Sequence, residues 1–178
     1  MQRRHNSVDL IAEVRRHIEE HDRGALTERC VGEHRCKVHL DQTSVCLACD
    51  SSSLFPDPQA TRPDVLIATL GGNAILHWVV VEMTIGSKGA TEVVGQLQAG
   101  ADAVSQSDAL RRNSASLIAV VLRRQGKQVA SLQKLREPAY RVGVGGRRLP
   151  VRVRLCGENL STVTTCVGLE FRHFIVSR

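Results

Sequence analysis

The residues best suited to chemistry are two carboxylates, Asp64 and Glu82, in the most apolar part of the chain. Asp64 precedes the apolar stretch 65–70, and Glu82 lies near the end of a second stretch, 74–84. Carboxylates that converge beside apolar strands carry a high desolvation cost unless a positive charge compensates them. Oxygen ligands of this kind suit Mg²⁺ or Mn²⁺, which can activate water and stabilise charge on a phosphate. The pair is a candidate metal site; spacing alone favours a purely structural alternative, in which Asp64 caps the strand entry and Glu82 pairs with an arginine.

The spacing of the two stretches predicts how these carboxylates face each other. Both stretches read as strands of one antiparallel hairpin, in which alternate side chains share a face. A three-residue loop after Leu70 would pair Leu70 with Ala74 and Asp64 with Val80. Asp64 would then share the face of Glu82, one diagonal step away, whereas a two-residue loop would separate the two carboxylates.

The elements that must position this pair form an α/β (α+β) pattern. Apolar periodicity predicts helices over 8–21 and about 91–104, and alternation or short apolar runs predict strands between and after them. The order helix, hairpin, helix, strand implies a mixed sheet with flanking helices, within a single domain over 1–178. The predicted strands are 35–40, 44–48, 65–70, 74–84, 117–122, 141–144 and 151–155.

Three local motifs carry a resemblance to a known family. They are Arg62-Pro63-Asp64, the strand 79–84, and a helix that contains Gln96-Leu97-Gln98-Ala99-Gly100-Ala101. Together they resemble the PD-(D/E)XK nuclease superfamily, in particular uncharacterised bacterial members with a Glu-Leu-Lys-Ser-Gly turn and a Gln-Leu-Gln-x-Gly-Ala helix. The resemblance covers roughly 37–122. It implies a restriction-endonuclease-like core over about 8–125 with a β-rich extension over about 138–178.

The resemblance also implies an activity, namely Mg²⁺- or Mn²⁺-dependent hydrolysis of DNA phosphodiesters in bacterial defence or DNA processing. Asp64 and Glu82 match the two metal-holding acids, and Gln96 matches a helix glutamine that faces the site in related nucleases. Asp50 stands where such proteins often carry a further acid. Glu13 or Glu20 could supply an acid from the first helix, although a solvated surface charge is the favoured interpretation of both.

The chain departs from the family pattern at Thr84. The motif lysine should stand two residues after Glu82, where its charge would offset the carboxylates and orient water, and a threonine hydroxyl supplies no such charge. One hypothesis is that Lys88, in the Gly86–Gly89 loop, reaches back into the site. The other is that catalysis has been lost and the fold binds nucleic acid or a partner protein.

The overall charge permits a polyanionic partner, and the family resemblance makes DNA the first candidate. The 24 basic residues exceed the 18 acidic ones by six, and 20 of the 24 are arginine. With only 3% aromatic residues, base stacking on exposed rings is not expected. Arg152 and Arg154 share one strand face near Arg147 and Arg148, so these four arginines are candidates for phosphate contacts. A homodimer or a partner subunit is also compatible with the sequence.

The cysteines support two interpretations. Cys30, Cys36, Cys46 and Cys49 include one CxxC pair and could hold a structural Zn²⁺, the basis of a third hypothesis, a zinc-stabilised interaction protein. Six cysteines without a secretory signal instead favour reduced, buried thiols in the cytoplasm, which is the preferred interpretation. No window is long and apolar enough for a membrane span.

Overall fold

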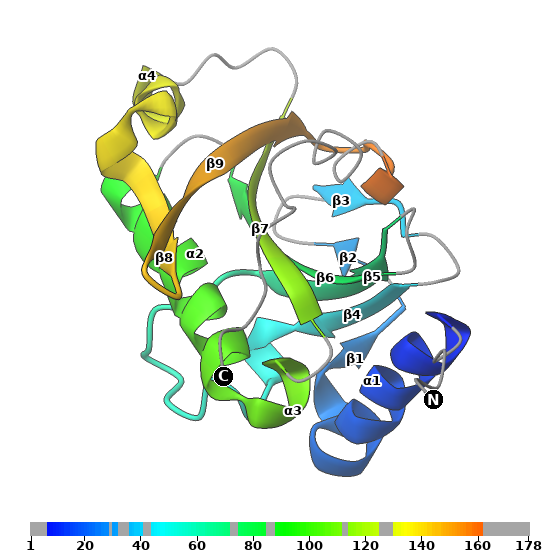
Figure 1. Cartoon of the computed structure of the whole chain (residues 1–178). Helices are drawn as coiled ribbons and strands as arrows, with labels where there is room; N and C mark the ends of the chain where they lie inside the picture. Colours follow the sequence, from blue (N-terminus) through cyan, green and yellow to red (C-terminus); the bar gives the residue numbers. More distant parts are fainter. Residues whose placement is uncertain are drawn as a thin grey trace.

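A seven-stranded mixed sheet forms the centre of the protein in its computed structural model (Figure 1). The structure describes residues 7–28, 30–31, 36–40, 44–71, 75–84, 88–111, 114–124 and 130–161. The helices are α1 (Ser7–His21), α2 (Ala90–Gln106), α3 (Asp108–Arg111) and α4 (Ala130–Gln133), with 3₁₀ turns that include η3 (Cys49–Ser51) and η4 (Lys134–Arg136). The strands are β1 (Leu26–Thr27), β2 (Cys30–Val31), β3 (Lys37–Val38), β4 (Ser44–Ala48), β5 (Val65–Leu70), β6 (Leu76–Thr84), β7 (Ser114–Arg123), β8 (Arg141–Val144) and β9 (Arg147–Leu155).

The expected α/β class is confirmed, and the sheet has the order β1-β4-β5-β6-β7-β9-β8. The pairs β4–β5 and β5–β6 are antiparallel, whereas β6–β7 and β7–β9 are parallel. The wholly apolar run 117–122 lies in β7, where every one of its side chains is buried. The C-terminal strands β8 and β9 join the main sheet beyond β7.

The β5–β6 hairpin has a longer loop than the sequence predicted. Leu70 pairs with Leu76 rather than with Ala74, and the Gly71 N–H donates to the Ile75 carbonyl at 2.9 Å. The predicted pairing of Asp64 with Val80 is therefore wrong by two residues, because Leu66 lies opposite Val80. A shift of two preserves which face each side chain takes, so Asp64 and Glu82 still share a face.

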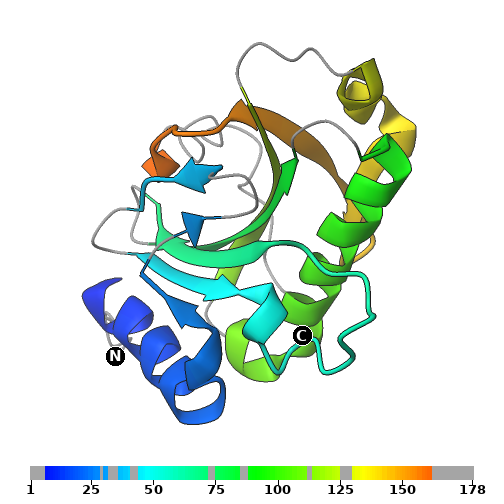
Figure 2. The same cartoon turned by 180° about the vertical axis from the view of Figure 1, so that it is seen from behind.

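The two faces of the sheet are covered differently. One face packs against α1 and α2 through a large apolar core, and the other carries a smaller core with the β2–β3 hairpin beside it. Figures 1 and 2 show α1 lying near β1 and β4, while α2 lies toward the β8–β9 end. Trp78 is fully buried on the helix side, where its indole N–H donates to the Leu110 carbonyl at 3.0 Å. The helix-covered face is also the face that Glu82 occupies.

Helix α2 approaches the sheet most closely at Gly100. A Cβ placed there would lie 2.5 Å from Val80 Cγ1 and 2.8 Å from Pro63 Cγ. We expect Gly100→Ala to lower the free energy of unfolding by about 1–3 kcal/mol, because the helix must move away from the sheet. Gly95→Ala is the matched control: no atom lies within 4 Å of its Cβ, and we expect a gain of about 0.5–1 kcal/mol from helix propensity. Urea denaturation of both variants checks this, and equal effects would contradict it.

A disulfide joins Cys36, just before β3, to Cys156, just after β9. The expectation of reduced thiols is therefore wrong for these two cysteines, while Cys46 and Cys49 are free and buried. The partners are 120 residues apart, a separation that gives no local signal. Backbone bonds reinforce the link, since Gly157 N–H donates to the Lys37 carbonyl at 2.8 Å. In the described part of the chain, no helix is long and apolar enough to cross a bilayer.

Candidate active site

The β5–β6 register places Asp64 directly opposite Glu82. Val65 pairs with Val81, so the next residues outward, Asp64 and Glu82, face each other at the end of the hairpin. Residues opposite each other in this way have Cβ atoms about 5 Å apart. Asp64 Oδ2 accepts the Met83 N–H at 2.5 Å, which holds its carboxylate against β6. The two carboxylates are closer than the predicted diagonal arrangement required.

Lys88 reaches Glu82 from the segment that precedes α2. Its Nζ lies 2.5 Å from Glu82 Oε1, and the exposed fractions of the two side chains are 24% and 0%. Lys88 immediately precedes Gly89, the N-terminal cap residue of α2. The start of the helix therefore fixes the backbone position from which the Lys88 side chain extends to Glu82. This is the placement expected of a lysine that replaces the missing motif lysine, although its catalytic role stays a prediction. Thr84 itself is buried and two residues beyond Glu82.

Gln96 completes a small polar cluster around Glu82. With its amide oriented to satisfy both neighbours, Gln96 Nε2 donates to Glu82 Oε1 at 3.1 Å and Gln96 Oε1 accepts from Lys88 Nζ at 3.1 Å. Gln96 lies about one and a half turns into α2. The three residues in contact therefore come from a strand (Glu82), a loop (Lys88) and a helix (Gln96). We call Asp64, Glu82, Lys88 and Gln96 the Glu82 cluster. The structure brings all four predicted site residues into it.

The charges of the cluster are strongly coupled. Burial, and then the charge of Asp64, raise the pKa of Glu82 to about 7, against the opposing effect of Lys88. For Lys88, burial disfavours the charged form, but the hydrogen bond and charge of Glu82 outweigh it and raise the pKa above its usual value. The site therefore holds a lysine that is charged at neutral pH beside a carboxylate that changes its protonation near neutral pH.

This raised pKa predicts a specific pH dependence of stability in the absence of divalent ions. The folded protein binds the Glu82 proton more tightly than the unfolded chain does, so the stabilising contribution of this proton is fully present below about pH 4.5. That contribution is lost as the pH rises from about 4.5 to about 7, and 2.5 pH units correspond to about 3 kcal/mol. Glu82→Gln should remove the loss. Unfolding in urea with EDTA at pH 5 and pH 8 checks the prediction, which fails if the two proteins show the same change.

The oxygen atoms of the cluster fit a hard divalent cation. Glu82 Oε2 is buried and has no hydrogen-bond partner among the described residues, while Asp64 stands on the adjacent strand. A carboxylate oxygen left in this state is costly, and a cation is one way to satisfy it. Within the described ranges no three His, Cys, Asp or Glu side chains form a metal-type group. Two carboxylates and several waters are nevertheless a common Mg²⁺ environment.

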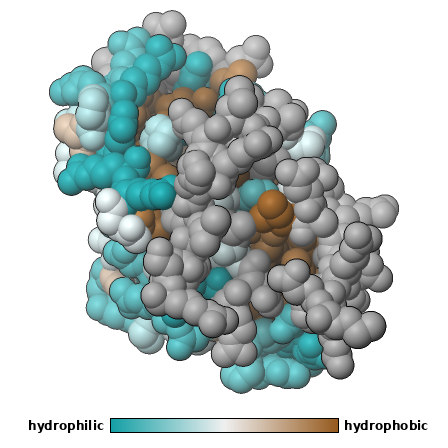
Figure 3. Space-filling model, in the orientation of Figure 1, coloured by the Kyte–Doolittle hydropathy of each residue, from teal (hydrophilic) through white to brown (hydrophobic). Residues whose placement is uncertain are grey.

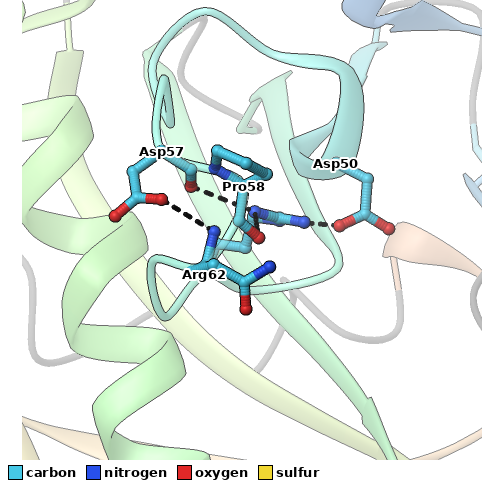
Figure 4. A network of polar contacts seen from close by, with 5 residues as sticks. Asp50, Asp57, Pro58 and Arg62 are labelled. Atoms are coloured by element: carbon cyan, nitrogen blue, oxygen red, sulfur yellow. Dashed lines mark hydrogen bonds and ion pairs between the residues drawn. The ribbon is translucent and has the colours of Figure 1, made fainter.

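Asp50 lies outside the cluster and has a structural role. Its side chain is 77% exposed and its Oδ1 accepts from Arg62 Nε at 2.7 Å. Arg62 also donates to the carbonyls of Asp57 and Pro58, so the loop before Asp64 is held by one guanidinium (Figure 4). The network fixes the approach of the chain to Pro63 and Asp64. The other two acids considered in the sequence, Glu13 and Glu20, are exposed on α1.

Two features near the cluster were missed from the sequence. Cys49 N–H donates to the Asp64 carbonyl at 3.0 Å, and burial, followed by the charges of Asp64, Asp50 and Glu82, raises the pKa of its thiol. Gln98, two residues after Gln96, donates to the Gly143 carbonyl at 2.9 Å and accepts from the Gly143 N–H at 2.7 Å. The paired glutamines of the helix motif therefore do different things: Gln96 faces Glu82 and Gln98 fastens β8 to α2.

The proposed zinc ligands do not form a group in the described structure. Cys36 is bonded to Cys156, and Cys46 and Cys49 lie on opposite sides of the sheet in different apolar cores. The side chain of Cys30 lies outside the described residues. A structural Zn²⁺ thus stays an untested prediction.

The four candidate arginines of β9 differ in exposure and in position on the strand. Arg147 and Arg148 are exposed, and Arg152 and Arg154 are half-buried. By strand alternation with Val151 and Val153, which contact the helix-side core, Arg152 and Arg154 extend from the other face of the sheet. They are not grouped with the Glu82 cluster, and their contact with nucleic acid stays a prediction.

Comparison with known proteins adds no assignment to this geometry. No family model, no curated protein and no solved structure matches the chain.

Proposed function

We propose that the protein is a divalent-metal-dependent nuclease that hydrolyses DNA phosphodiesters on a restriction-endonuclease-like fold. The observation that carries this proposal is the convergence of Asp64, Glu82, Lys88 and Gln96 from separate segments at one end of the β5–β6 hairpin. A carboxylate pair with an adjacent cation is suited to phosphoryl chemistry, because it can hold a metal while the cation offsets the negative charge.

The order of the elements supports the fold part of the proposal. Helix α1 precedes the strands β4, β5 and β6, and α2 then carries the chain to β7, which is parallel to β6. This is the helix, hairpin, helix, strand order that the apolar periodicity of the sequence predicted. The site also lies at strand ends, where side chains can reach a substrate without disturbing the buried middle of the sheet.

Each residue of the cluster has a defined task in this proposal. Asp64 and Glu82 would hold Mg²⁺ or Mn²⁺, which when bound lowers the pKa of water and stabilises charge on the phosphate. Lys88 lowers the pKa of Glu82, against the larger raising effect of burial, by supplying a positive charge at 2.5 Å, and the same ammonium can stabilise negative charge developing on a phosphate. Gln96 fixes the direction of both side chains through its two hydrogen bonds.

A non-catalytic module on the same fold is the second candidate, and the observation that favours it is the buried Thr84 at the motif lysine position. Such a module would bind DNA or a partner protein through its arginines without cutting. It predicts salt-sensitive DNA binding with no metal-dependent cleavage.

Cleavage of DNA by the purified protein, with and without added Mg²⁺ or Mn²⁺, tests the proposal. Cutting that needs the metal and disappears in Glu82→Ala supports the nuclease. Binding without cutting at any metal concentration favours the second candidate.

A further inference from the structure

A second polar feature lies at the same end of the sheet as the Glu82 cluster. It is a cavity of about 300 Å³ at the ends of β7 and β9, beneath α4 and η4. Its polar lining consists of Arg123, Gln133, Arg136, Arg154 and Glu158. Figure 3 shows hydrophilic side chains gathered on the surface over α4, β8 and β9.

The strand registers place this cavity beside the cluster. Thr84 of β6 pairs with Arg123 of β7, which pairs in turn with Leu155 of β9. Arg123 follows the helix-side alternation of Ala119 and Val121, so it leaves the sheet on the face that carries Glu82. One strand spacing and two residues along the strand separate Glu82 from Arg123, which is about 8 Å between backbones. Arg123 thus stands next to the position that lacks the motif lysine.

The charge of the cavity suits an anion. Arg123 and Arg136 bring two guanidinium groups to it against one carboxylate, Glu158, whose Oε1 already accepts the Leu155 N–H at 3.2 Å. Arg154 also borders the cavity, but by strand alternation its side chain extends from the other face of the sheet. Guanidinium groups present several donors in a planar fork that matches phosphate oxygens. Arg136, on η4, is exposed and can meet a ligand without a change of fold.

We infer that this cavity, through Arg123 and Arg136, binds a phosphate of the nucleic acid that is held at the Glu82 cluster. The inference rests on the proposed function and names the second anchoring point of its substrate. The Arg123 backbone lies about 8 Å from that of Glu82, so its guanidinium can reach a phosphate within a few nucleotides of the one at the Glu82 cluster, since phosphates of one strand follow every 3.4 Å along a duplex axis. The bound nucleic-acid strand would therefore run from β6 across β7 toward β9.

Binding of a labelled 12-nucleotide duplex in EDTA tests the inference separately from cleavage. We expect Arg136→Ala to bind about tenfold more weakly than the wild type, with a salt slope reduced by about one, because one phosphate contact is lost. Arg136→Lys should keep part of the affinity. The control is Arg111→Ala, another exposed arginine, which pairs with Asp108 before the opposite end of β7 and should bind as the wild type does.

Duplexes with and without terminal phosphates separate the two sources of the anion. An equal loss on both duplexes assigns an internal phosphate to the cavity, and a loss confined to the phosphorylated duplex assigns a terminal one. The inference is overturned if Arg136→Ala and Arg136→Glu both bind like the wild type, or if Arg111→Ala weakens binding equally. None of these outcomes depends on cutting, so a protein that binds through Arg136 but never cleaves would contradict only the nuclease proposal.

Discussion

Glu82→Ala is expected to reduce metal-dependent DNA cleavage by roughly a thousandfold or more, because it removes one of two metal-holding carboxylates. The remaining Asp64 is bonded to the Met83 N–H and would have to hold the cation alone. Lys88 would also lose its ion pair with Glu82 and stay half-buried beside Asp64. A plasmid-nicking rate measured at pH 8 in Mn²⁺ gives the size of the effect.

Loss of cleavage in Glu82→Ala must be separated from loss of the fold, and two further variants do so. Glu82→Gln keeps the side-chain volume and removes the charge whose burial is costly at pH 8, so it should be inactive yet no less stable than the wild type. Glu19→Ala, an exposed acid on α1, is the matched control for loss of a glutamate and should cut normally. An inactive Glu19→Ala, or an active Glu82→Gln, would show that the cluster is not the site.

Lys88→Met is expected to lower cleavage by about a hundredfold, since the cluster loses its one ammonium group and the charge that opposes two carboxylates. The pKa of Glu82 should also rise above about 7, because Lys88 is the group that lowers it. The pH at which cleavage reaches half of its maximum should therefore move upward in the variant. A pH–rate profile between pH 6 and pH 9 measures both effects.

Two further variants show whether the position of the charge matters. Lys88→Arg keeps a cation at the same place and should recover part of the activity, with its pH profile near that of the wild type. Lys37→Met removes an exposed lysine of β3, beside the other face of the sheet, and should change neither quantity. If Lys88→Met cuts at the wild-type rate and pH, the ion pair with Glu82 is structural only.

The main elements of the fold could be predicted from local pattern. Alternation and apolar runs predicted β4 and β5 at their observed bounds, and helical spacing predicted α2 to within two residues. The hairpin loop was misjudged because glycines after Leu70 suggested a turn inside 71–73, whereas pairing resumes at Leu76. The error was harmless for the site because an even shift in register leaves each side chain on its original face.

The parts of the site that escaped prediction depend on contacts between distant segments. Arg123 lies beside Thr84 because β6 and β7 pair in parallel, and α2 and α3 separate these two strands in the sequence. No local spacing in the sequence specifies that register. Gln98 reaches Gly143 over 45 residues, and Cys36 reaches Cys156 over 120. Lys88, by contrast, was predictable because it is six residues from Glu82 and one of only four lysines.

The central claim is that the Glu82 cluster hydrolyses DNA with a divalent metal, and nicking of supercoiled plasmid by the purified protein in Mn²⁺ tests it most directly. The expected result is conversion to open-circular DNA that stops when EDTA is added and is absent in Glu82→Ala. No nicking by the folded wild type, or nicking that persists in Glu82→Ala, would contradict it.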